Sequence, residues 1–147
     1  MRPLAVAILR SCLSLLLTAA PCRAEVKYAL LPASAVNGIT SYQGTWIPGK
    51  ADIAELEASI TQISKLQITG WTSALHIEHP EKYFRQYVPL IRKGRRIFYV
   101  SAFCEDPPPE DWRKRLFVVN DGATCFWQAL YDPETGKYSH LTINARA

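Results

Sequence analysis

The stretch SAFCEDPPPEDWRKRLFVVNDGATCFWQALYD, residues 101–132, decides the fold because it sets two apolar segments and two cysteines on either side of a proline-rich loop. Suppose that the two segments pair as antiparallel strands with Cys104 opposite Cys125. The same register then pairs Ala102 with Trp127, Val100 with Ala129, and Phe98 with Tyr131. All eight side chains lie on one side of the hairpin, since strand side chains alternate with a period of two. The pattern predicts a core-facing hairpin closed by a cross-strand disulfide.

Two cysteines can also form a metal pair or a redox couple. A metal pair favours a C-x-x-C spacing or nearby histidines, and a redox couple favours C-x-x-C at a helix start. Cys104 and Cys125 match neither pattern. A disulfide is therefore expected, and closing a loop of about 20 residues stabilises a fold by roughly 3 kcal/mol.

Residues 1–24 have the composition of an export signal. Arg2 and Arg10 flank a mostly apolar lead, SCLSLLLTAA is an apolar run, and CRA is a small-residue cleavage site before Glu25. The segment is too short for a membrane span, and no other window of the sequence has 18 consecutive apolar residues. We expect a cleaved signal peptide, a periplasmic or secreted mature protein, and no stable membrane insertion after cleavage.

Cleavage after Ala24 changes both the charge and the cysteine count. Three of the 17 basic residues are removed, which leaves 14 against 13 acidic residues and a net charge of about +1. Cys12 and Cys22 are removed as well, so two cysteines meet an oxidising compartment. Lipidation at Cys22 and an uncleaved anchor are the alternatives, but the AAP that precedes Cys22 matches a lipobox poorly.

A helix is predicted over residues 52–67. Apolar side chains recur there at helical spacing, at Ile53, Leu56, Ile60 and Ile63. Asp52 and Glu55 are placed as a capping box, and Gly70 is expected to end the helix.

Residues 83–144 have a sequence pattern typical of strands separated by turns. Apolar segments alternate with the turn signals RKGR, NDGA and DPETGK, which is typical of an antiparallel meander. Residues 116–119 are expected to form a short strand of their own or to continue past a kink at NDGA. Residues 25–50 are an irregular lead-in with one strand around residues 39–46. We therefore predict an α+β domain over residues 51–147, with one helix on a four- to five-stranded antiparallel meander.

No catalytic or metal site is predicted. The cluster HIEHPE, residues 76–81, holds two histidines and two glutamates, but a polar loop explains these residues equally well. No nucleophile elbow is present, and the carboxylates around the triple proline are expected to be solvated. We expect no cofactor.

Two basic runs, RKGRR at 92–96 and WRKR at 112–115, raise the question of nucleic-acid binding. The meander places them at opposite ends of one strand, roughly 30 Å apart. Such a separation forms no single compact patch, so nucleic acid is not an expected partner.

The order of a helix followed by an antiparallel meander resembles cystatin-like folds. In cystatins the first hairpin carries Q-x-V-x-G, and the matching QYVPL retains Gln86 and Val88 but has Leu90 at the glycine position. The second-loop Pro-Trp of cystatins is missing from DPETGK, so the likeness implies a topology and no protease inhibition. The segments WIPGKADIAELEASI, YFRQY, NDGATCFWQALYD and LTINARA are also similar to small exported bacterial proteins of unknown function.

Two functions from different classes follow. The first is a non-enzymatic binding or inhibitory module that acts on another envelope or secreted protein, with contact residues at Trp46, Arg95, Arg96 and Trp112. The second is a small-molecule-binding protein or enzyme with a pocket between helix and sheet, lined by Trp71, Tyr99, Phe103 and Trp127.

Overall fold

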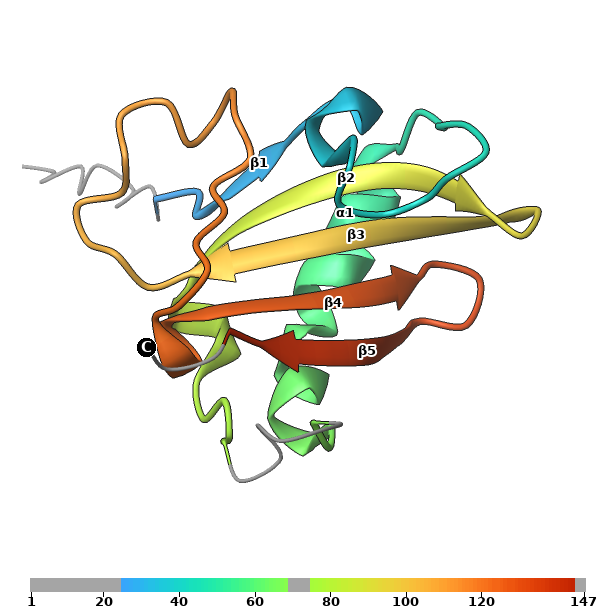
Figure 1. Cartoon of the computed structure of the whole chain (residues 1–147). Helices are drawn as coiled ribbons and strands as arrows, with labels where there is room; N and C mark the ends of the chain where they lie inside the picture. The colour runs from blue at the N-terminus through green and yellow to red at the C-terminus, as the bar shows by residue number, and fades with distance from the viewer. Residues whose placement is uncertain (1–24, 69–74, 145–147) are drawn as a thin grey trace, which may run out of the picture.

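The computed structural model describes residues 25–68 and 75–144, and its fold is α+β (Figure 1). One α-helix, α1 (Lys50–Ala58), accompanies a five-stranded sheet in the order β1-β2-β3-β4-β5. The strands are β1 (Tyr28–Leu30), β2 (Phe84–Arg92), β3 (Arg95–Phe103), β4 (Phe126–Asp132) and β5 (Lys137–Ile143). Short 3-10 helices are η1 (Ala33–Val36), η2 (Ile60–Lys65), η3 (Pro80–Lys82) and η4 (Ala123–Cys125).

The hairpin register expected from the cysteines is the one observed. In the β3–β4 ladder Ala102 pairs with Trp127, and the two neighbouring pairs are Val100 with Ala129 and Phe98 with Tyr131. The disulfide links Cys104 to Cys125 across the end of this ladder, with a Cα–Cα distance of 5.0 Å. All six paired residues are buried in the core beneath the helix. Disulfides persist in oxidising compartments, which agrees with an exported protein.

The sheet is mixed, which corrects the prediction of a purely antiparallel meander. Strands β2 to β5 form the meander, but β1 runs parallel to β2 at the outer edge. The strand predicted around residues 39–46 is also wrong, because that segment makes only an isolated bridge between Gly44 and Ile91. Residues before the helix therefore pair with β2 at two separate places along one edge.

Helix α1 begins two residues earlier than predicted and ends sooner. The N–H of Gly49 donates to the Asp52 carboxylate at 2.7 Å, so Asp52 closes the first turn from inside the helix instead of preceding it. The chain narrows to the 3-10 helix η2 after Ser59, where β-branched Ile60 and Thr61 disfavour the α conformation. The predicted terminator Gly70 lies outside the described residues.

The two faces of the sheet carry separate cores. The face toward α1 and η2, behind the sheet in Figure 1, buries side chains such as Leu56, Tyr87, Phe98 and Trp127. The opposite face buries others, including Phe84, Val88 and Phe103. A sheet with apolar groups on both faces needs a cover on each.

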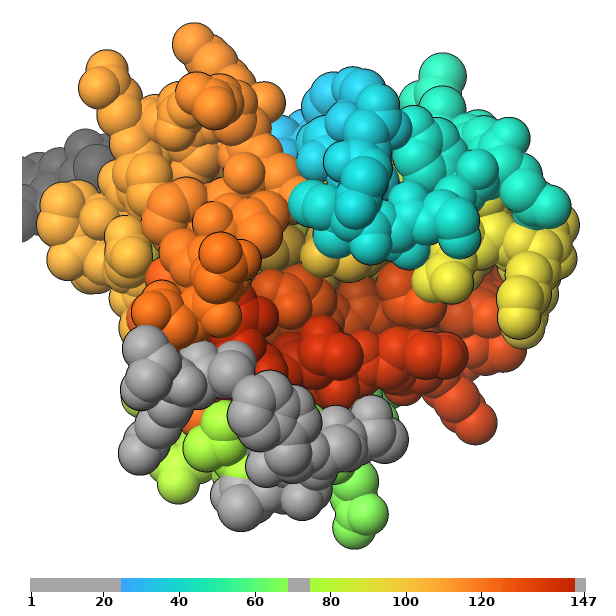
Figure 2. Space-filling model, viewed as in Figure 1, coloured from blue at the N-terminus to red at the C-terminus, as the bar shows by residue number. Residues whose placement is uncertain are grey.

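Two segments cover part of the second face, and together they are called the lid here: residues 31–42, with η1, and residues 104–122. Figure 2 shows them side by side over β2 and β3, in blue to cyan and in orange. Residues 116–119 form no strand, which contradicts the prediction. Leu116, Phe117 and Val119 pack on the sheet, where Phe117 lies 5.1 Å from Phe103 between ring centroids. Part of β4 and β5 is left uncovered on this face.

Opening the disulfide should destabilise this fold without unfolding it. A closed loop with a sequence separation of 21 restricts the unfolded chain, so the double variant C104S/C125S is expected to lose about 3 kcal/mol of unfolding free energy. Urea denaturation followed by tryptophan fluorescence measures the change. Reduced and oxidised wild-type protein with the same denaturation midpoint would contradict this expectation.

Candidate functional site

A groove on the uncovered half of the second face is the strongest candidate for a binding site. Its central hollow, about 290 Å³, is lined by the lid residues Ile39 and Thr40 together with side chains of β2 to β5. An adjoining hollow of about 220 Å³ extends toward the two hairpin turns and shares Arg92, Leu130 and His140 with the first. The two hollows together are called the sheet groove.

A β-bulge brings His140 into the sheet groove. The β4–β5 ladder shifts register between Gln128 and Leu130, and His140 has a φ of +53°, which is unusual for a residue other than glycine. The extra residue lets Tyr138 and Leu141 both face the helix-side core although they are three apart. His140 is left at the groove with its Nδ1 3.0 Å from the hydroxyl of Ser139.

The groove is basic at its turn end and polar at its centre. Arg92 and Lys93 line it, and among the described residues neither forms an ion pair. Arg95 is already engaged, with its guanidinium 2.5 Å from the carboxylate of Asp132. Tyr99 also lines the groove, and burial raises the pKa of its phenol to about 12.

The residues predicted to contact a partner do not form one surface. Arg95 lines the groove, but Trp112 is 5 % exposed and packs from the inner side of the lid against Phe84 and Phe103 of the sheet. Trp112 is therefore unavailable to a partner, since its indole fills the second core. Trp46 is half-buried, and its Nε1 donates to the carbonyl of Ile97 at 3.2 Å. Arg96 stacks its guanidinium 5.0 Å from the centre of the Trp46 ring.

The aromatic side chains predicted to line a helix–sheet pocket are not brought together. Trp127 lies in the helix-side core, whereas Tyr99 and Phe103 belong to the opposite face. The sheet itself separates them, because residues 99 and 103 have the opposite parity to the residues of β3 that face the helix. Trp71 lies outside the described residues.

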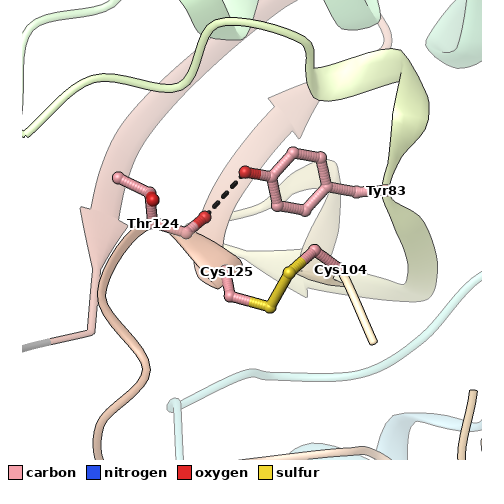
Figure 3. The surroundings of a disulfide bond; sticks show 4 residues. All are labelled: Tyr83, Cys104, Thr124 and Cys125. Atoms are coloured by element: carbon pink, nitrogen blue, oxygen red, sulfur yellow. Dashed lines mark hydrogen bonds between the residues drawn. A yellow bond between two sulfur atoms is a disulfide. The ribbon is translucent and has the colours of Figure 1, made fainter. Parts of the chain in front are cut away.

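A separate hollow, outside the sheet groove, adjoins the disulfide. It measures about 470 Å³, and its lining is His76, Glu78, His79, Lys82, Tyr83, Cys104 and Thr124. Tyr83 donates its hydroxyl to the carbonyl of Thr124 at 2.7 Å beside the disulfide (Figure 3). His79 faces Glu81, with 3.3 Å between Nδ1 and the carboxylate. Across residues 25–68 and 75–144, the structure shows no group of three or more side chains suited to a metal ion.

A buried ion pair ties α1 to the sheet. The Arg85 guanidinium donates from Nε and from a terminal nitrogen to the two carboxylate oxygens of Glu57, at 3.0 and 2.8 Å, and Tyr87 donates its hydroxyl to the same carboxylate. Burial raises the pKa of Tyr87 well above its usual value, so this hydroxyl keeps its proton. Burial opposes the charged form of Arg85, but its hydrogen bonds and charge interactions with Glu57 and Tyr87 together outweigh burial, so the pKa of Arg85 is raised. Since every group has a partner, we interpret this network as structural.

Comparison with protein-family models, with curated proteins and with solved structures found no match. Within the described residues, none of the helices has the length and apolar character that a bilayer span requires.

The groove was missed from the sequence although one signal for it was present. Tyr138, Leu141 and Ile143 are spaced by three and then by two, which a regular strand with one buried face cannot accommodate. That irregular spacing marks a bulge, and a bulge next to a histidine is a reason to examine the site. Arg92 and Leu130 carry no comparable signal in the sequence. They line the same hollow only because the lid leaves this part of β4 uncovered.

Proposed function

We propose that this chain is an exported, non-enzymatic binding module that engages another envelope or secreted protein through the sheet groove. The signal peptide over residues 1–24 and a periplasmic or secreted location are parts of the same proposal. The observation that carries it is the groove itself, an open hollow on one face of a sheet that is packed on its other face. The cystatin-like order of elements, extended by β1, is compatible with a small scaffold that presents a binding surface.

The alternative of a ligand pocket between helix and sheet has less support. Side chains of α1, η2 and the sheet fill that interface, and the described members of the predicted aromatic set lie on different faces. The groove is an open surface feature, and a partner surface can enter it without displacing any core residue.

Site-specific photo-crosslinking tests the proposed function. A photoreactive residue at Thr142, exposed on the groove face, is expected to form one discrete protein adduct in living cells that export the full chain. The same residue at Ala54, exposed on α1, provides the matched control on the opposite face. Adducts that are identical from both positions, or absent from Thr142, would contradict the proposal.

The His140→Ala variant offers a finer test of the groove. Removing the imidazole takes away a hydrogen-bonding group but leaves the bulge. The yield of the adduct from Thr142 should therefore fall measurably, by up to about tenfold, while the urea midpoint stays within error. An unchanged adduct yield would show that His140 makes no contact with the partner.

A further inference from the structure

The sheet groove continues across the lid as one line of hollows. A third hollow, about 350 Å³, lies in the seam between the two lid segments, and its lining includes Ile39, Lys114, Leu116 and Val118. Ile39 also lines the central hollow of the sheet groove. The line therefore runs from the lid seam, past Ile39, to the β2–β3 turn, over the face shown in Figure 2.

This line brings together the two basic runs that the meander places apart. Residues 104–122 fold back over the sheet, so Lys114 and Arg115 line the seam while Arg92 and Lys93 line the groove. The acidic residue lining these hollows is Asp132, and it is engaged by Arg95 at 2.5 Å. The surface therefore carries positive charge at both of its ends, where Asp132 engages Arg95 at one end and Asp111 engages Arg115 at the other.

Apolar groups lie between the charges. Ile39 is 46 % exposed and Val118 is 52 % exposed, although both are large aliphatic side chains, and Leu130 is half-buried in the groove floor. Aliphatic patches fit aliphatic side chains of a partner, whereas single-stranded nucleic acid is bound on exposed aromatic rings. The tyrosines that line these hollows offer no exposed ring, because Tyr99 is partly buried and Tyr131 is fully buried in the sheet.

We infer that the line of hollows binds an extended acidic segment of a partner protein, with aliphatic side chains set among its carboxylates. The inference rests on the proposed function and specifies the chemistry of the partner. Carboxylates would pair with Arg92 and Lys93 at one end and with Lys114 at the other, and an aliphatic residue would lie against Ile39 between them.

The test uses the exported, disulfide-bonded protein and a labelled peptide of repeated Glu-Ser-Leu-Glu units, followed by fluorescence anisotropy. The variants R92E and K114E should each weaken binding, and the double variant R92E/K114E should weaken it by about tenfold or more. The double variant K50E/K65E on the helix side changes the net charge equally and should alter affinity by less than about twofold. Raising the salt concentration should weaken binding of the wild type.

Three outcomes would overturn the inference. One is an equal loss of affinity in K50E/K65E, which would show that net charge alone governs binding. Another is a loss of affinity in only one of the variants R92E and K114E, which would show that the peptide does not span the whole line of hollows. The third is equal or tighter binding of a Glu-Ser-Ser-Glu peptide or of an oligothymidine, which indicates a general polyanion surface. If the Thr142 adduct persists unchanged in R92E/K114E, the inference fails while the proposed function stands; if wild type forms no adduct, the proposed function fails.

Discussion

Replacing Arg85 with Met is expected to lower the free energy of unfolding by about 4 kcal/mol, because it leaves the largely buried Glu57 carboxylate without its cationic partner. The Arg85 side chain is 6 % exposed and that of Glu57 is 27 % exposed. Besides Glu57, the guanidinium donates to the carbonyls of Glu81 and Tyr83 at 3.0 and 2.6 Å. Methionine fills a similar volume and satisfies none of these acceptors.

The double variant R85M/E57M separates the ion pair from simple packing. With both charges removed, no buried charge lacks a partner, and at least half of the lost stability should return. The control R115M removes an arginine whose side chain is 81 % exposed and pairs with Asp111 at 3.2 Å one turn away. Such a surface pair contributes about 0.5 kcal/mol or less.

Urea denaturation of the four proteins measures these changes. The prediction is wrong if R85M is no more destabilising than R115M, or if adding E57M to R85M destabilises the protein further. If α1 detached while the sheet stayed intact, the slope of the unfolding free energy against urea concentration would change instead.

The central hairpin could be predicted because two independent signals agree on it. The cysteine positions and the parity of the apolar residues demand the same register, so Phe98 is correctly placed opposite Tyr131. Strand β1 carries no such signal. Three residues are too few to show a period, and their partner in the sheet, Arg85 to Tyr87, lies more than 50 positions later in the chain.

The lid could not be predicted because its apolar residues imitate a strand. Leu116, Phe117 and Val119 cover a sheet, and sequence pattern does not distinguish covering a sheet from joining it. Trp112 stands among prolines and charged residues, which is typical of an exposed loop. Its burial depends on a polar tie from the strand below it.

That polar tie is Gln86, and its replacement is the second change with a large expected effect. Gln86 is fully buried on the lid-facing side of β2. Its Nε2 donates to the carbonyls of Trp112 and Arg115 at 2.5 and 2.6 Å, and its Oε1 accepts from the N–H of Phe117 at 2.8 Å. One side chain therefore satisfies three backbone groups of a segment that has no strand partners of its own.

The variant Q86M keeps the length of the side chain and removes all three hydrogen bonds, so the free energy of unfolding should fall by about 4 kcal/mol. Residues 112–117 should also loosen, since these backbone groups then bond best to water. Amide hydrogen exchange should accelerate over this segment more than in β3, and the fluorescence of Trp112 should shift to longer wavelength. The line of hollows depends on the seam at Val118, so the Glu-Ser-Leu-Glu peptide should bind more weakly to this variant.

The matched control is Q67M, at an exposed position after η2, which should stay within about 0.5 kcal/mol of the wild type. The interpretation of Gln86 as the tie of the lid is wrong if Q86M is as stable as Q67M. It is also wrong if amide exchange over residues 112–117 in Q86M is as slow as in the wild type. A lid-specific effect is expected because the β2–β3 ladder, the disulfide and the helix-side core are all untouched by the change.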